Sequence, residues 1–324
     1  TIYRPAHILA LSMRRCYFSI MNRMGGILAG LGYSTIFGFS FLMTKEALEV
    51  LNPMELLAMR FIIAALLMSI LVIAGIIQVD FKGKPIGLLA LMCLFQPIAY
   101  FTFETYGLAN AATNVAGIIL GALPAGVAIM EALLLKERLS ALQSAGLSMS
   151  IVGVILVAVF GQGHNTETKP IGIIFLTGSM LSAVFFNIAS KKAAESFSPV
   201  ERTFAMMWSA AICFFIPALF ENIKGKGNIS HLFGEWNRIA GVWGGILYLG
   251  ILSSVGAFFL INYSLSQLKA SQSAVFTNLV TVITVLAGVL IRKEQFSWSQ
   301  GLSVILIILG IAVVNSSFKE KAKS

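Results

Sequence analysis

The chain has 324 residues, of which 57% are hydrophobic and only 11% are charged, and its formal net charge is +9. An ordinary soluble domain has about 25% charged residues, so this composition excludes a soluble globular protein and indicates an integral membrane protein. Because the basic residues are scattered over polar loops, the positive charge does not indicate nucleic-acid binding, and we attribute it to membrane orientation and contact with anionic lipid headgroups.

A basic segment, residues 1–23, precedes the first long apolar run. Its own apolar stretch, residues 8–11, is too short for the hydrophobic region of a signal peptide. We therefore expect a cytoplasmic N-terminal arm. Because the chain begins with Thr1, the alternative is an upstream extension with native initiation at Met21 or Met24.

Ten apolar runs follow, each near the roughly 20 residues that a helix needs to cross a bilayer. The gaps between them are short and polar and leave no room for a separate soluble domain. We therefore predict an all-α polytopic membrane protein with ten transmembrane helices and a basic cytoplasmic tail at 317–324. The predicted spans are 25–44, 54–77, 85–107, 112–135, 142–160, 171–190, 200–220, 239–262, 271–291 and 298–316.

The two halves of the chain share one sequence pattern. Residues 106–159 align with residues 263–316 without a gap at an offset of 157, and the earlier parts of each half correspond at an offset of 146. We predict two five-helix repeats, 24–160 and 171–316, joined by a loop at 161–170. Internal repeats in an apolar chain are typical of secondary transporters. Matching pairs include Tyr106 with Tyr263, Lys136-Glu137 with Lys293-Glu294, Gln143 with Gln300, Lys45 with Lys191, and Glu55 with Glu201.

The lysines and arginines predict the orientation of the spans. With the N-terminus inside, fifteen of them lie on the cytoplasmic side and seven on the opposite side, while Arg60 falls within the second span. This excess favours a cell-membrane protein with both termini in the cytoplasm. Five spans per half is an odd number, so the second repeat would be inverted relative to the first.

The sequence argues against an enzyme and against a bound cofactor. The only aspartate, Asp80, lies in a loop, so the Asp-rich metal sites of membrane-embedded transferases cannot be assembled. The three histidines lie in the N-terminal arm and in loops, and the three cysteines lack metal or redox spacing. No Gly-rich phosphate loop is present either, so we expect neither a metal nor ATP hydrolysis.

The third span carries the strongest polar face. Gln96, Tyr100 and Glu104 recur at four-residue steps, and Pro97 breaks the backbone ladder beside Gln96. A carboxylate at membrane depth is costly unless it is paired or hydrated. Arg60 lies at similar depth in the second span, so Glu104 either pairs with Arg60 or acts on the substrate or a proton.

The fourth and ninth spans carry matching stripes of small and polar residues, and the sixth span carries Asn187. For the glycines the alternative explanation is close helix packing. Asn114 and Asn278, however, need hydrogen-bond partners inside the membrane and should face the bundle interior or water. The stripes are Asn114, Gly117, Gly121, Pro124, Ala128 and Glu131, and Ser271, Ala274, Asn278, Thr281, Val285 and Gly288.

Residues 106–153 and, more loosely, 263–310 carry a recognisable pattern: a tyrosine, a span with Pro124, the run L-x-K-E-R-L-x-x-x-Q-x-x-G and a Gly-rich closing helix. This pattern resembles the EamA domain of the drug/metabolite transporter superfamily, and the resemblance covers 25–314 as two domains. It implies ten-helix, inverted-repeat carriers with cytoplasmic termini, many of which export amino acids or other small metabolites. The second copy departs from it, with Thr281 in place of Pro124.

We therefore predict a secondary transporter that exports a small polar or amphipathic metabolite by alternating access, with the proton as a candidate coupling ion. Its cavity would be walled by the first, third and fourth spans and by the sixth, eighth and ninth. The alternatives are a nucleotide- or lipid-linked sugar carrier and a non-transporting membrane subunit. The predicted substrate-binding residues are Gln96, Tyr100, Glu104, Asn114, Gly121, Asn187 and Asn278, with Glu104 and Arg60 as coupling or charge pair.

Overall fold

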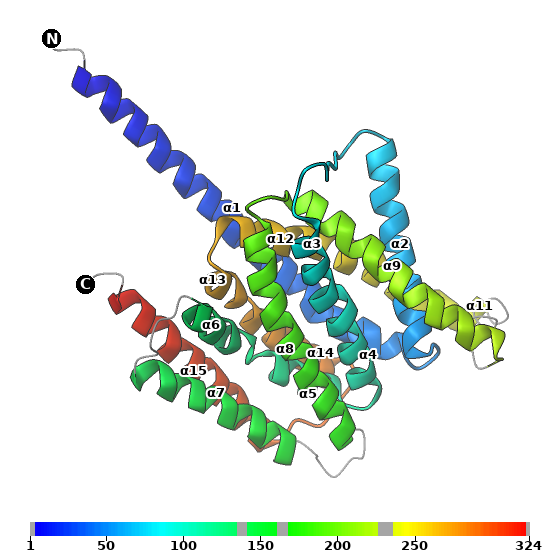
Figure 1. Cartoon of the computed structure of the whole chain (residues 1–324). Coiled ribbons are helices and arrows are strands. Elements are labelled where there is room, and N and C mark those ends of the chain that lie inside the picture. Colours follow the sequence, from blue (N-terminus) through cyan, green and yellow to red (C-terminus); the bar gives the residue numbers. More distant parts are fainter. Residues whose placement is uncertain (1–3, 135–140, 161–167, 226–235, 322–324) are drawn as a thin grey trace.

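The computed structural model describes residues 4–134, 141–160, 168–225 and 236–321, and within these ranges the chain forms helices and no strand (Figure 1). The lysine-containing corner predicted at Lys136 and most of the predicted inter-repeat loop lie outside the described residues.

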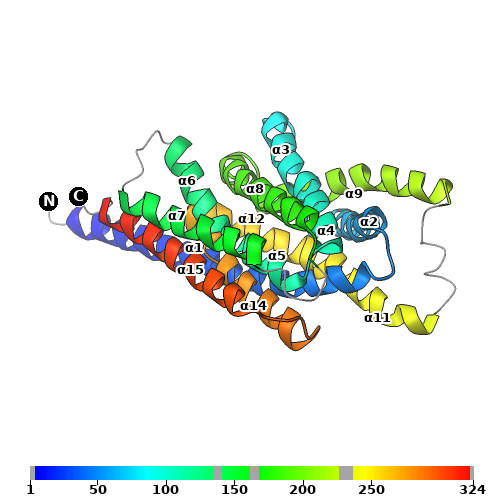
Figure 2. The same cartoon turned by 90° about the horizontal axis from the view of Figure 1, so that it is seen from below.

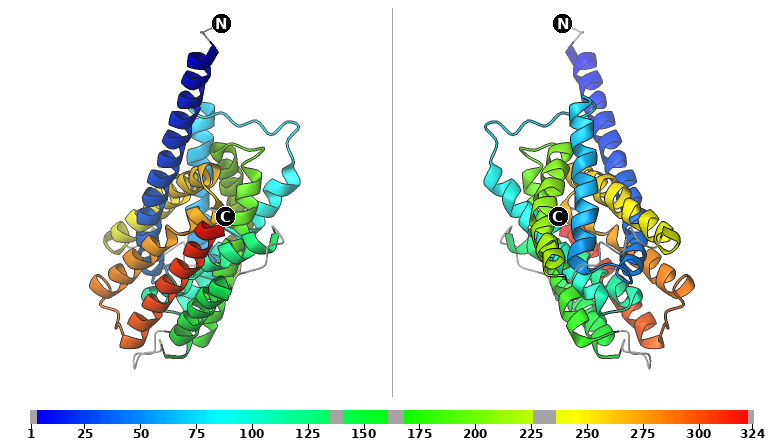
Figure 3. Two further views of the ribbon diagram at one scale, coloured as in Figure 1. Left: turned by 90° about the vertical axis from the view of Figure 1, so that its left-hand side faces the viewer. Right: turned by 90° about the vertical axis from the view of Figure 1, so that its right-hand side faces the viewer.

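The described part of the first half contains three uninterrupted helices and two spans that are divided into shorter segments. The first span extends well beyond the bundle at its N-terminal end (Figure 3). The elements are α1 (Arg4–Ala47), α2 (Pro53–Ile73), α3 (Ile86–Cys93), the π-helical segment η1 (Leu94–Ala99), α4 (Tyr100–Ala109), α5 (Thr113–Leu120), α6 (Leu123–Leu134) and α7 (Ala141–Phe160).

The second half repeats this division, with its third and fourth spans again broken into shorter segments. The elements are α8 (Pro170–Ala193), α9 (Pro199–Ile223), α11 (Trp236–Leu247), the π-helical segment η2 (Tyr248–Ala257), α12 (Phe258–Gln267), α13 (Ala270–Ala274), α14 (Thr277–Leu290) and α15 (Trp298–Lys321).

Within the described ranges, eight helical spans are long and apolar enough to cross a membrane. The predicted fifth and tenth spans coincide with α7 and α15, whose apolar stretches are shorter, 144–153 and 298–310. These two helices pack against each other along one side of the bundle (Figures 1 and 2). The chain is therefore an all-helical, multi-pass protein, while the count of ten spans stays a prediction.

The starts of α2 and α9 follow the same sequence signal. Each begins with a proline, preceded by a polar residue whose backbone N–H donates to a glutamate three residues later. Asn52 N donates to Glu55 Oε2 at 3.2 Å, and Ser198 N donates to Glu201 Oε2 at 2.9 Å. Because these glutamates take up free N–H groups, they can be buried at the helix ends. The two helices also pack against each other.

The predicted backbone break in the third span is present. Gln96 has an extended backbone (φ −150°, ψ 122°) between α3 and α4, directly before Pro97. Residues 248–257 form a second π-helical segment in the eighth span, although no proline is present there. The two interruptions overlap at the offset of 157 residues that relates the halves. Each interruption carries buried polar side chains, Gln96 in the first and Ser253 and Ser254 in the second.

Two lysines close the C-terminal ends of helices from equivalent positions. Lys45 Nζ donates to the Leu108 carbonyl at the end of α4 at 2.8 Å. Lys191 Nζ donates to the Leu265 carbonyl near the end of α12 at 3.0 Å. Each lysine also donates to the carbonyl three residues further on. A cation at this place satisfies carbonyls that lack a helical partner and complements the helix dipole, so the same helix-to-helix tie is built twice.

Candidate functional site

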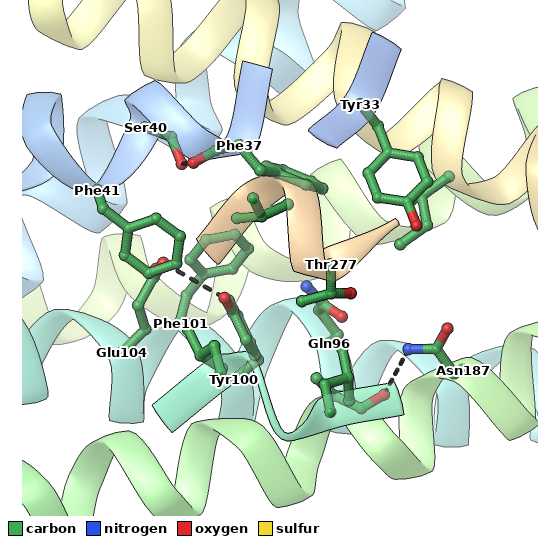
Figure 4. Close-up of a pocket in the computed structure, with 15 residues that line it drawn as sticks. Tyr33, Phe37, Ser40, Phe41, Gln96, Tyr100, Phe101, Glu104, Asn187 and Thr277 are labelled. Atoms are coloured by element: carbon green, nitrogen blue, oxygen red, sulfur yellow. Dashed lines mark hydrogen bonds between the residues drawn. The ribbon is translucent and has the colours of Figure 1, made fainter. Parts of the chain in front are cut away.

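A pocket with a cavity volume of about 50 Å³ lies between the spans. Its walls come from α1, η1, α4, α5, α6, α8, α12 and α14. These elements belong to the first, third, fourth, sixth, eighth and ninth spans, which are the six expected to wall a cavity. Figure 4 shows the α1 rings on one side of the pocket and Gln96, Tyr100 and Glu104 on the other.

The lining consists mainly of aliphatic and aromatic side chains and contains a single carboxyl group. It includes five aromatic rings, one carboxylate and a few neutral polar groups, and no lysine or arginine is among the described residues that line it. The lining residues are Tyr33, Phe37, Ser40, Phe41, Gln96, Tyr100, Phe101, Glu104, Leu120, Leu123, Ala183, Asn187, Ile261, Thr277 and Val280.

Glu104 is the one carboxylate of the pocket, and its side chain is poorly satisfied. The residue is 2% exposed. Its Oε1 accepts a long hydrogen bond of 3.4 Å from the Tyr100 hydroxyl, and its Oε2 has no hydrogen-bond partner among the described residues. A buried carboxylate in this condition is costly. The pocket therefore offers an oxygen that a proton or a ligand can occupy.

No ion pair in direct contact joins Arg60 to Glu104 in the described part of the chain, but the two buried groups lie near enough to interact electrostatically. Arg60 Nε donates to Ser254 Oγ at 2.7 Å and its Nη2 donates to Ser253 Oγ at 2.8 Å. Its guanidinium also lies 4.2 Å from the centre of the Phe101 ring. The two serines belong to η2, so the interrupted helix supplies the acceptors for this buried cation.

Four of the seven predicted substrate-binding residues meet in the pocket: Gln96, Tyr100, Glu104 and Asn187. Asn187 Nδ2 donates to the Ala183 carbonyl one turn earlier on α8 at 2.8 Å. This bond fixes the amide and leaves its oxygen for other contacts. The polar groups of η1, α4 and α8 thus face one space (Figure 4).

Asn114, Gly121 and Asn278 do not line this pocket. Asn114 lies at the start of α5, where its backbone N–H donates to Glu294 Oε2 at 2.8 Å and its Nδ2 donates to the Gln295 carbonyl at 3.1 Å. A Cβ at Gly121 would lie 2.8 Å from Thr281 Oγ1, so this glycine permits close packing of the two stripes. Asn278 has a buried Oδ1 for which the described ranges supply no hydrogen-bond partner.

Sequence reasoning placed the first span in the cavity wall but named none of the α1 side chains that line the pocket. Tyr33, Phe37, Ser40 and Phe41 follow one another at four, three and one residue, so they form one helical face. This spacing was available in the sequence. Aromatic residues are also common on lipid-facing surfaces, however, and the pattern does not say which face of a membrane helix is turned inward.

The long apolar helices, which surround a buried and partly polar pocket, place this chain among the multi-pass membrane proteins. Comparison with known families then identifies the chain. It belongs to the EamA-like transporter family, whose model matches residues 24–159 and again residues 170–316. The chain is thus a transporter by family, and the match to each half agrees with the repeat seen in the sequence.

Proteins of similar sequence are also named as transporters. The chain is 30% identical to the uncharacterized transporter YcxC of Bacillus subtilis (strain 168) over 91% of this chain and 94% of that protein. It is 23% identical to a probable amino-acid metabolite efflux pump of Escherichia coli (strain K12), over 90% of this chain and 95% of that protein. A solved crystal structure with 20% identity aligns with a TM-score of 0.63 over 92% of this chain and 99% of that one, which supports the fold.

Proposed function

We propose that this protein is a secondary active transporter that exports small metabolites across the cell membrane by alternating access. The observation that carries the proposal is the pocket, in which a buried and poorly satisfied Glu104 faces an otherwise uncharged lining. The E. coli relative named as a probable amino-acid metabolite efflux pump supports export.

The proposed mechanism uses two inverted five-helix repeats. The pocket is walled by three spans of each half. If the halves rock against each other, the same pocket opens to one side and then to the other. The lysine ties at the ends of α4 and α12 would let each helix move as a unit with α1 or α8.

The two alternatives are less well supported. A carrier of nucleotide- or lipid-linked sugars would need cations to hold phosphate groups, and the described lining contains neither lysine nor arginine. A non-transporting subunit would leave the cost of burying Glu104 without a purpose.

Transport in liposomes tests the proposal directly. The purified full chain would be reconstituted and screened for uptake of amino acids, amines and other small metabolites, with an inward or outward proton gradient. We expect saturable uptake of at least one compound class, accelerated by the gradient. The control is a pocket variant, Thr277→Trp, which should transport none of them. Folded protein that binds a compound in the pocket but moves none would favour the non-transporting alternative.

The inverted repeat predicts that two exposed loops lie on opposite sides of the membrane. Lys82 follows the second span, and Lys224 follows the seventh; both are exposed. In a background without native cysteines, a membrane-impermeant thiol reagent should label Lys82→Cys only from the cytoplasmic side and Lys224→Cys only from outside. Labelling of both variants from the same side would contradict the inversion.

A further inference from the structure

The chemistry of the pocket restricts its ligand further than the family does. We propose that the pocket takes an amphipathic organic cation, an amine bearing an apolar or aromatic group, with Glu104 holding the ammonium. The inference rests on the proposed function, because it takes this pocket as the substrate site. It is carried by three features of the lining: the carboxylate, the aromatic walls and the lack of a basic residue.

The carboxylate supplies the site for the charge. Within the part of the chain that the structure describes, Glu104 Oε2 is buried without a hydrogen-bond partner, and Oε1 accepts only the 3.4 Å bond from Tyr100. An ammonium donates up to three hydrogen bonds and carries the opposite charge, so it would satisfy both oxygens at once. A neutral ligand could donate to Glu104 but would bring no opposite charge to the carboxylate in this low-dielectric site.

The aromatic rings supply the second half of the site. Tyr33 and Phe37 have ring centres 5.9 Å apart, and Tyr100 and Phe101 have ring centres 4.9 Å apart. All four line the pocket. Ring faces attract an organic cation through their quadrupole, and ring surfaces bury its apolar group. The lining therefore favours a cation with a hydrophobic body over a strongly hydrated ion.

The nearby Arg60 does not make the pocket a binding site for anions. Arg60 is 2% exposed and does not line the pocket. Its Nε and Nη2 donate hydrogen bonds to two serines of η2, and its guanidinium lies over the Phe101 ring. A carboxylate on the ligand would meet Glu104 without a basic side chain in the described lining to hold it. The geometry thus disfavours anions and, to a lesser degree, zwitterionic amino acids.

Four ligands that share one phenyl group separate these possibilities. Binding of phenethylamine, phenylethanol, phenylalanine and phenylpropionate would be measured by equilibrium dialysis against the purified full chain in nanodiscs. We expect phenethylamine to bind about tenfold or more tightly than phenylethanol, and phenylpropionate to bind most weakly. Glu104→Gln should remove the advantage of the amine and leave phenylethanol binding within about twofold.

Two further variants separate loss of the carboxylate from loss of structure. Glu104→Asp keeps a carboxylate and should keep the preference for phenethylamine over phenylethanol. Glu131→Gln, on α6 and outside the lining, removes a carboxylate without touching the pocket and should bind like the parent protein. Phenethylamine binding that is absent, or unchanged in Glu104→Gln, would overturn the proposal, as would tighter binding of phenylpropionate.

Failure of this inference is distinguishable from failure of the proposed function. Uptake of another compound class without amine binding would overturn the amine assignment and leave transport intact. Glu104-dependent amine binding without uptake in liposomes would support the assignment and contradict transport.

Discussion

Glu104→Gln is expected to abolish the pH dependence of transport while leaving the folded protein almost as stable as the parent. The side chain keeps its size, and the parent carboxylate makes only one long hydrogen bond, from Tyr100. We therefore expect the free energy of unfolding to change by no more than about 1 kcal/mol. Transport, by contrast, would lose the group that takes up a proton in one exposure state and releases it in the other.

The expected effect depends on which groups surround Glu104. Tyr100 donates to it from the same helix, and Arg60 on α2 is bonded to serines of η2 instead. Arg60 should keep its hydrogen bonds to Ser253 and Ser254 when Glu104 is replaced, and it loses only the attraction of the nearby carboxylate. If the variant were instead destabilised by several kcal/mol and rescued by Arg60→Met, the two residues would be a structural pair after all.

The measurement compares initial transport rates from mildly acidic to mildly alkaline buffer, normalised to folded protein. Thermal unfolding in the same detergent gives the stability. Glu131→Gln serves as the matched control, since it removes a carboxylate outside the pocket. Transport by Glu104→Gln with the parent's pH profile would show that another group couples the proton, or that none does.

Much of the fold follows from local sequence properties. Long apolar runs determine where helices can cross a bilayer, and eight of the predicted spans meet this condition. The break at Gln96 follows from Pro97, whose ring removes a backbone donor. The π-helical segment in the eighth span has no such residue, because Ser253 and Ser254 occupy the equivalent positions. It was therefore not predicted.

The partners of buried charges could not be predicted in the same way. Lys191 and Arg202 count as cytoplasmic charges in the orientation argument, yet Arg202 is fully buried. It donates to Ser190 and Ser266 hydroxyls and to the Asn262 carbonyl, linking α9 to α8 and α12. Sequence gives depth along a helix, but not the rotation of one helix against another, and that rotation decides the hydrogen-bond partners.

Because sequence does not show how helices are rotated against one another, only part of the candidate site could be predicted. Gln96, Tyr100 and Glu104 share a face because four-residue steps return to the same side of a helix, and the pocket contains all three. The Asn114 amide nitrogen finds its partners in the Gln295 carbonyl, before α15, and in Gln300 on α15, whereas its Oδ1 has no partner among the described residues. The residue type was informative in both cases. Only the tertiary contacts distinguish a ligand-facing amide from one that joins helices.

The second large effect concerns bulk inside the bundle, where two substitutions to tryptophan should fail for different reasons. Thr277 lines the pocket and points into its space (Figure 4). A tryptophan there would fill volume that a substrate needs. Thr277→Trp should therefore lose substrate binding and transport while giving folded, monodisperse protein in nearly normal yield.

Gly121→Trp should instead lose the folded protein itself. A Cβ at this position would already lie 2.8 Å from Thr281 Oγ1 and 3.0 Å from the Ile118 carbonyl. Even Gly121→Ala should cost about 1–3 kcal/mol, because a close-packed contact has no room for the added methyl group. The measurements are the yield after size-exclusion chromatography and transport per folded molecule.

Leu66→Trp is the control for both variants, since Leu66 is 54% exposed on the outer surface of the bundle. It should fold and transport normally. A folded Gly121→Trp protein that has lost only transport would restore the original prediction that this stripe contacts substrate. Normal transport by Thr277→Trp would show that the substrate does not pass through this pocket. The tryptophan would occupy the space that a bound substrate needs.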